Sequence, residues 1–242
     1  RFIMAGMDAP LYPDSNDENV WAHWSRGNYG PGDWSGSHND LAAGVDLYHT
    51  DHSRAGISVM HTNSSLDRTE NLGEVSMKKK FTRVSLYGRH DFAGGLHAAG
   101  DVFAGGIRIK DTSLVDMSTR TAGVHAEVCV DVPAGRGTIT PLVRAAYAGI
   151  RGFTTKDGEG FPFTMKESHY SSFSAGLKAS FPLSPVSLLT AYAGWGIRTG
   201  YDIDGTMSDA WNTMDISESG KEHVKTLGIG YRCDVTPFAR LS

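Results

Sequence analysis

The chain has 242 residues, with 23 Lys and Arg against 27 Asp and Glu, and its formal charge is −4. Such a nearly balanced charge does not favour nucleic acid as a partner. The sequence has no run of about 18 apolar residues, which excludes a membrane-spanning helix. It does not exclude a membrane β-barrel, because the strands of such a barrel alternate apolar and polar residues and average out as polar.

Two residue types are used unusually. Glycine accounts for 29 of the 242 residues, well above the usual share of about 7%. Cysteine occurs only at Cys129 and Cys233, and neither residue lies in a CxxC motif, so no zinc site is expected. Their parity places them on opposite strand faces, which argues against a disulfide. Because Arg1 is not an initiator Met and no signal peptide follows it, we expect a piece of a longer precursor.

Alternation of apolar and polar residues predicts about ten strands and no convincing helix, apart from a possible helix end at residues 1–9. The expected strands are 20–26, 40–50, 54–62, 80–92, 96–109, 120–132, 139–150, 170–181, 186–198 and 224–235. Within 96–109 the parity of the apolar residues shifts at Gly105–Gly106, which suggests a β-bulge.

The connections between these segments alternate in length. Short turns ("DHS", "DFAGG", "PAGRG", "PLSP") are followed in turn by longer, mainly polar links over 63–76, 110–119, 151–168 and 199–222. Strict alternation places every short turn at one end of the structure and every long link at the other. Up-and-down meanders have this property, whereas the crossovers of a Greek-key sandwich would scramble the order.

The stretch "TAGVHAEVCVDV" at 121–132 shows the two faces of such a strand: valines and alanines alternate with His125, Glu127 and Asp131. We expect the apolar face to point outward to lipid, because the polar face is rich in small residues and neither face has enough bulky side chains to fill a soluble barrel. The predicted polar lining of the lumen is Asp46, Arg54, Arg83, Arg89, Asp101, His125, Glu127, Asp131 and Lys178. Aromatic residues near strand ends are expected at the membrane interfaces, namely Trp21, Trp24, Tyr48, Phe92, Phe181, Trp195 and Tyr231.

The order of short motifs resembles a known family. "VWAHWSRGNYG", "GVDLYHTDHSRAGISVMHTNSS" and "VSLYGRHDFAGGLHAAGDVFAG" are similar to the opening strands of the autotransporter β-domain of type V secretion. "TAGVHAEVCVDV", "ITPLVRAAYAGI", "FSAGLKASF" and "LLTAYAGWGI" resemble later strands of the same domain. The resemblance extends over about residues 19–235, and it is the order and spacing of the motifs that make it specific.

The resemblance implies a twelve-stranded barrel in the outer membrane of a Gram-negative bacterium, joined to an upstream passenger and assembled by the barrel-assembly machinery. We expect residues 1–18 to be a linker or the end of the passenger or of a lumen-threading helix, and residues 19–242 to form the barrel as a monomer. The family usually ends in an aromatic residue, whereas this chain ends in "FARLS". This departure, together with the ten visible strands, predicts that the last hairpin is missing.

No motif predicts catalysis. His125, Glu127 and Asp131 share one face, but no third ligand at a diagnostic spacing accompanies them, so we favour a structural polar lining over a metal or acid–base site. The sequence has no Gly-x-Ser-x-Gly elbow, and its Gly-rich stretches do not open helices. Asn16 and Asn19 form no Asn-Asn junction, so self-cleavage of a passenger is not predicted. We therefore expect no enzyme, cofactor or metal.

The expected function is that of an outer-membrane translocator that anchors an N-terminal passenger and helps to export it to the cell surface. Two alternatives remain open at this point. One is an outer-membrane porin or adhesin-type barrel without a passenger. The other is a soluble β-barrel that binds a small ligand in its lumen.

Overall fold

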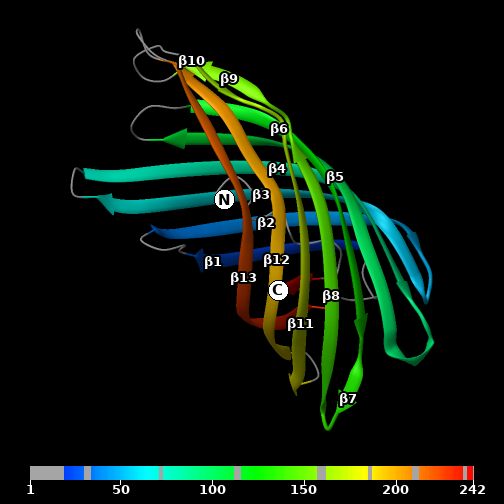
Figure 1. The fold of residues 1–242 in the computed structure, drawn as a ribbon. Helices are drawn as coiled ribbons and strands as arrows, with labels where there is room; N and C mark the ends of the chain where they lie inside the picture. The colour runs from blue at the N-terminus through cyan, green and yellow to red at the C-terminus, as the bar shows by residue number, and fades with distance from the viewer. Residues whose placement is uncertain are drawn as a thin grey trace.

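The computed structural model describes residues 19–29, 34–70, 73–111, 116–156, 162–184, 187–208, 213–236 and 239–241. Nearly all of these residues lie in one antiparallel sheet, and Figure 1 shows this sheet curled into a half-barrel. The helical structure in the described residues is a single 3-10 turn at Ala93–Gly95. None of the helical structure in these ranges is long and apolar enough to cross a membrane. The predicted all-β, up-and-down architecture is confirmed.

Ten long strands follow one another around the sheet, each paired antiparallel with the next long strand along the chain. They are β1 (Val20–Tyr29), β2 (Trp34–His49), β3 (Ser53–Glu70), β4 (Gly73–Asp91), β5 (Leu96–Asp111), β6 (Asp116–Val130), β8 (Gly137–Ile150), β11 (Ser168–Ser184), β12 (Ser187–Ser208) and β13 (Thr213–Thr236). Four short strands complete the set: β7 (Val132–Ala134), β9 (Phe153–Lys156), β10 (Pro162–Met165) and β14 (Ala239–Leu241). β14 pairs with β13 and also approaches β1, although within the described residues no ladder joins β1 to β13 or β14.

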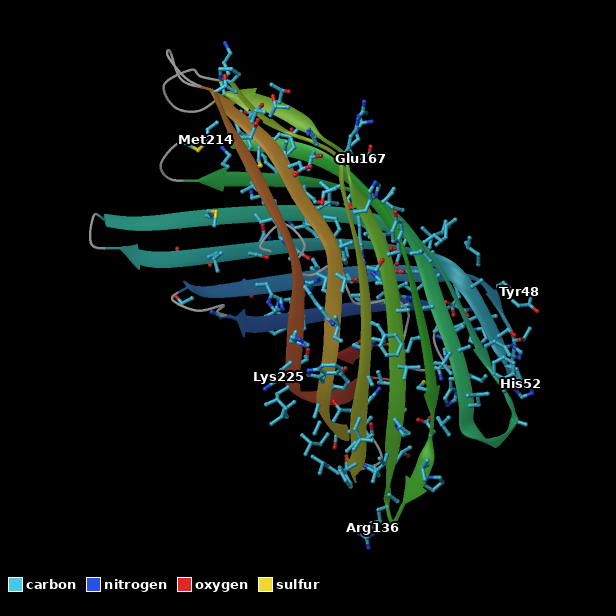
Figure 2. The ribbon with its side chains drawn as sticks, viewed as in Figure 1. Tyr48, His52, Arg136, Glu167, Met214 and Lys225 are labelled. Carbon is cyan, nitrogen blue, oxygen red and sulfur yellow. The ribbon has the colours of Figure 1, made fainter. Side chains whose placement is uncertain are left out.

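The short turns gather at one end of the sheet, as their alternation with the long links predicts. Gly94, Gly95 and Gly135 have φ angles of 77°, 77° and 62°, a left-handed conformation that glycine adopts without steric cost. Figure 2 shows His52 and Arg136 at this end and Met214 at the opposite end. We call the two ends the short-turn end and the long-hairpin end.

The long links differ from the expectation that they are polar loops. Residues 63–70 and 73–76 are strand, as are 199–208 and 213–222, so these links are mostly continuations of the neighbouring strands. The link over 151–168 contains β9 and β10, which form a small hairpin attached to β12. Backbone hydrogen bonding to the neighbouring strand sustains these polar segments, whose residues lack the apolar alternation used for the prediction.

The bulge predicted at Gly105–Gly106 is wrong. The register between β4 and β5 runs without a shift from Met77↔Asp111 to Asp91↔His97, and that between β5 and β6 is equally continuous. Ile107 and Ile109 are apolar but lie on the same face as Asp101, which made the pattern look as if it changed phase. A bulge does occur between Asp46 and Tyr48, where the β2–β3 register shifts.

The two faces of the sheet differ in composition. The convex face carries exposed Val, Leu and Ala residues, and Leu227 and Ile229 of β13 are 86% and 85% exposed. The concave face carries buried charged groups, but it also carries a buried apolar cluster that includes Met60, Phe81 and Ile107. The concave face therefore supplies bulky apolar side chains towards the long-hairpin end, which were not predicted there from the sequence.

Candidate functional site

The first polar group on the concave face centres on Asp46 of β2. The Trp21 indole Nε1 donates to the Tyr87 hydroxyl at 3.0 Å, and that hydroxyl donates to Asp46 Oδ1. The second oxygen of Asp46 lies 3.6 Å from Arg54 Nη1 and 3.4 Å from His49 Nδ1. A buried carboxylate needs such partners to offset the loss of its hydration. This group therefore ties β1 to β4 across the inner surface.

Glycines make room for the aromatic members of this group. A Cβ on Gly44 would lie 2.5 Å from the indole of Trp21, and one on Gly56 would lie 2.5 Å from the hydroxyl of Tyr87. Both distances are shorter than any ordinary contact, so these strand positions admit no side chain while the rings stay in place. Part of the high glycine content is explained in this way.

The second group joins β4, β5 and β6. Arg83 Nη2 lies 3.9 Å from Asp101 Oδ2, and the other oxygen of Asp101 is hydrogen-bonded to His125 Nδ1. The His125 ring stacks on Phe103 at a centroid distance of 5.0 Å, and the Arg83 guanidinium lies 5.1 Å from the same phenyl centroid. Arg83 is 0% exposed. Its charge is thus held by a carboxylate and an aromatic face rather than by solvent.

The third group spans β6, β8 and β12. Glu127 and Arg144 are direct register partners, and Arg144 Nε donates to Glu127 Oε2. The Arg144 guanidinium also lies 5.4 Å from the ring centroid of Tyr192 on β12. One arginine therefore connects three strands along the concave face.

A fourth group lies at the short-turn end. Arg89 Nε donates to Asp91 at 2.7 Å, and His97 Nδ1 lies 2.8 Å from the same carboxylate oxygen. His97 Nε2 is 3.0 Å from Asp131 Oδ2, whose other oxygen accepts a hydrogen bond from Thr140 at 2.5 Å. This group links the turn after β6 to β4, β5 and β8.

The residues predicted to line the lumen occupy different parts of this network. Six of them are buried on the concave face: Asp46, Arg54, Arg83, Asp101, His125 and Glu127. Arg89 and Lys178 are partly buried, and the Asp131 side chain is 44% exposed in the turn after β6. His125, Glu127 and Asp131 bond to three different partners and do not converge on one point. Among the described residues no group of three or more His, Cys, Asp and Glu could hold a metal ion.

The aromatic residues predicted at the membrane interfaces also differ in their exposure. Five have exposed side chains: Trp24, Tyr48, Phe92, Phe181 and Trp195. The structure places Trp21 differently, because its indole is buried on the concave face against Tyr87. The side chain of Tyr231 lies outside the described residues, and so does that of Cys233, while Cys129 is a free thiol.

Reasoning from the sequence missed several members of the network. Arg144, Tyr192 and Arg198 carry contacts on the concave face but were not predicted as lining residues. Strand parity alone would have placed Arg144 on the polar face. Its pairing with Glu127 could not be foreseen, because the β6–β8 register passes over the intervening β7 turn.

An apolar outer face and a charged, small-residue inner face, carried by an up-and-down sheet, define the class of outer-membrane β-barrels. Comparison with known proteins specifies the family. The family described as "Autotransporter beta-domain" matches residues 19–237, and the chain belongs to this family. It is an outer-membrane translocator domain for a passenger. Translocator domains of this family serve as structural transporters.

Solved structures show a similar fold. The β-domain of the Bordetella autotransporter BrkA has a TM-score of 0.58 at 14% identity, covering 89% of this chain and 98% of that one. The NalP translocator domain from Neisseria meningitidis has a TM-score of 0.59 at 18% identity, covering 93% and 80%. The AIDA-I transport unit from Escherichia coli has a TM-score of 0.65 at 17% identity, covering 94% and 83%. No curated protein matched by sequence.

Proposed function

We propose that the concave face lines the route along which an upstream passenger crosses the outer membrane, while the convex face holds the sheet in lipid. The observation that carries this proposal is the separation of chemistry between the faces. Arg83, Asp101 and Glu127 are buried inside, whereas Leu227 and Ile229 are largely exposed outside. Exposure of large apolar residues on this scale is unfavourable in water and favourable in lipid. This argues against the soluble ligand-binding barrel.

The division of the chain follows from the same proposal. Residues 19–242 form the membrane domain, and residues 1–18 are a linker or the end of the passenger or of a lumen-threading helix. Outer-membrane lipid and the barrel-assembly machinery are the other partners, and the domain acts as a monomer without catalytic activity. The lining residues are those buried on the concave face, and the interface aromatics are the exposed ones, without Trp21.

The apolar cluster on the concave face lies along the route proposed for the passenger. Phe81, Ile107 and Tyr170 are almost completely buried there, in the half of the sheet towards the long-hairpin end. A passenger leaving the barrel at that end would have to displace this cluster. We therefore propose that the route is closed by side chains at rest and opens only during export.

Surface display tests the proposal. An epitope is inserted into the full-length protein upstream of residue 1, and intact Gram-negative cells are stained with antibody before and after external protease. We expect staining that protease removes, while a periplasmic marker stays protected. An assembled barrel whose epitope becomes accessible only after the outer membrane is permeabilised would favour the porin or adhesin-type alternative instead.

A further inference from the structure

A group of basic residues lies on the convex face near the long-hairpin end. Its members are exposed and share the strand parity of the apolar residues further along the same strands; they are Lys78, Lys80, Arg108, Lys110 and Arg120. We call this set the basic patch. It lies on β4, β5 and β6, on the opposite face from the buried network. It is therefore not part of the lining described above.

The register places like charges directly opposite one another. Lys80 pairs with Arg108, and Lys78 pairs with Lys110. Side chains at such positions have Cβ atoms only about 5 Å apart, and like charges there are destabilising. Within the part of the chain that the structure describes, the side chains of Lys80 and Arg120 form no ion pair. The arrangement favours an anion that bridges several of these cations.

One carboxylate offsets part of this charge. Asp116 accepts hydrogen bonds from Arg108 at 2.9 and 2.6 Å and lies 3.2 Å from Lys110 Nζ. The hydrogen bond from Arg108 holds the pKa of the Asp116 carboxyl well below its usual range. Asp116 is thus ionised near neutral pH, and it neutralises one of the five positive charges. The remaining excess is positive.

Three residues of the basic patch border a hollow of about 480 Å³. The hollow lies over Gly106, where an added Cβ would meet no atom within 4 Å. Lys80, Arg108 and Arg120 line it. The other polar residues that line it are His61, Thr82, Ser118 and Thr119. The Thr82 hydroxyl is 2.7 Å from His61 Nδ1. The hollow therefore combines cations with hydroxyl groups, as a phosphorylated sugar would require.

The hollow borders the apolar part of the convex face. Two residues further along the same strands, Val84, Ala104 and Ala122 are register neighbours with exposed side chains. In outer-membrane barrels the long connections are extracellular and the short turns are periplasmic. The basic patch then lies at the level of the outer-leaflet headgroups, and acyl chains below it would contact the alanines and valines.

We propose that the hollow over Gly106 binds the phosphorylated sugar headgroup of an acylated glycolipid of the outer leaflet. Lys80, Arg108 and Arg120 contact the phosphate, and the acyl chains lie along Val84 and Ala104. The proposal rests on the orientation of the translocator in the membrane given above. It goes beyond export, since it assigns a specific lipid site to the outer surface.

Binding can be measured by native mass spectrometry of the full-length protein in detergent, with purified lipid A as the probe. We expect one tightly bound lipid A in the wild type. Lys80→Gln combined with Arg120→Gln should weaken binding at least tenfold. Gly106→Trp, which fills the hollow without changing any charge, should weaken it to a similar extent, and Ser118→Phe is a second filling variant if Gly106→Trp does not fold.

Matched controls distinguish a specific lipid site from nonspecific electrostatic attraction between the lipid phosphates and exposed positive charges. Lys225→Gln combined with Arg136→Gln removes two exposed positive charges elsewhere and should leave binding within twofold. Equal loss in this control and in the Lys80/Arg120 variant, or unchanged binding in both filling variants, would overturn the proposal. Dephosphorylated lipid A should bind at least tenfold more weakly. If inorganic pyrophosphate bound as tightly as lipid A, the ligand would be a free phosphate, and the assignment to a lipid would be wrong. None of these results depends on passenger export.

Discussion

On the concave face, several aromatic rings each pack over a glycine of a neighbouring strand. Trp21 covers Gly44, and Tyr87 covers Gly56, where any added side chain would overlap the ring. Phe103 lies against Gly123 in the same way, with 2.7 Å between a ring carbon and the position of an added Cβ. Glycine normally weakens a strand, so here the weakening is offset by the packing of the ring and by the hydrogen bonds it reaches.

Gly44→Val tests this pairing. The added side chain would displace the Trp21 indole and break its hydrogen bond to Tyr87, so we expect a loss of about 1–3 kcal/mol, as for other overpacked sites. Urea unfolding in lipid vesicles measures the change. Gly106→Ala is the matched control, because its Cβ meets nothing within 4 Å, and it should unfold at the wild-type midpoint or above. Equal destabilisation of both variants would contradict the pairing.

For single strands, the face on which a residue lies was predictable from the sequence, whereas its register partner on the neighbouring strand was not. In 54–62 and 80–92 the exposed and buried faces are those that alternation predicts, because one face is mainly apolar and the other mainly polar or glycine. In β5 the apolar residues Ile107 and Ile109 share a face with Asp101, so alternation of hydrophobicity no longer reports which side a residue faces. Register depends on turn length as well as on pattern, which is why the Glu127–Arg144 partnership could not be read from the sequence.

The Glu127–Arg144 pair should couple β6 to β8. A double-mutant cycle with Glu127→Ala and Arg144→Ala isolates the interaction, and for contacting charged residues we expect a coupling energy of about 1–3 kcal/mol. The unfolding free energy of the four proteins provides the measurement. The pair Glu127→Ala and His61→Ala, on opposite faces, should be additive within about 0.5 kcal/mol. A coupling near zero for Glu127 and Arg144 would mean that their contact adds nothing to strand pairing.

The two faces of one strand should also respond differently to charge. Val128→Arg places a charge on the convex face and should cost about 2–4 kcal/mol if the position is near the centre of the bilayer. Ser174→Arg, on the concave face, should be milder. The fraction of folded barrel, read from heat-modifiable migration on a gel, compares the two variants. Equal folded fractions for the two variants would contradict the assignment of lipid to the convex face.

In the molecule as a whole, the curl of the sheet places charged side chains on its inner face and apolar side chains on its outer face. The charged groups on the inner side contact one another in groups that each involve three or four strands, while the outer side remains apolar up to the basic patch. The class of fold was predictable because most strands repeat the same alternation and every second connection is short. The packed apolar cluster of the concave face was not, since it forms only when distant strands curl toward one another.

The central claim is that the convex face meets lipid and the concave face does not. Spin labels at residues 172–175 of β11, introduced one at a time into a variant lacking Cys129 and Cys233, test it in lipid vesicles. We measure relaxation by oxygen, which concentrates in lipid, and by a water-soluble nickel complex. We expect high oxygen accessibility at Phe173 and Ala175 and low oxygen accessibility at Ser172 and Ser174. The reverse alternation, or equal values at all four positions, would contradict it.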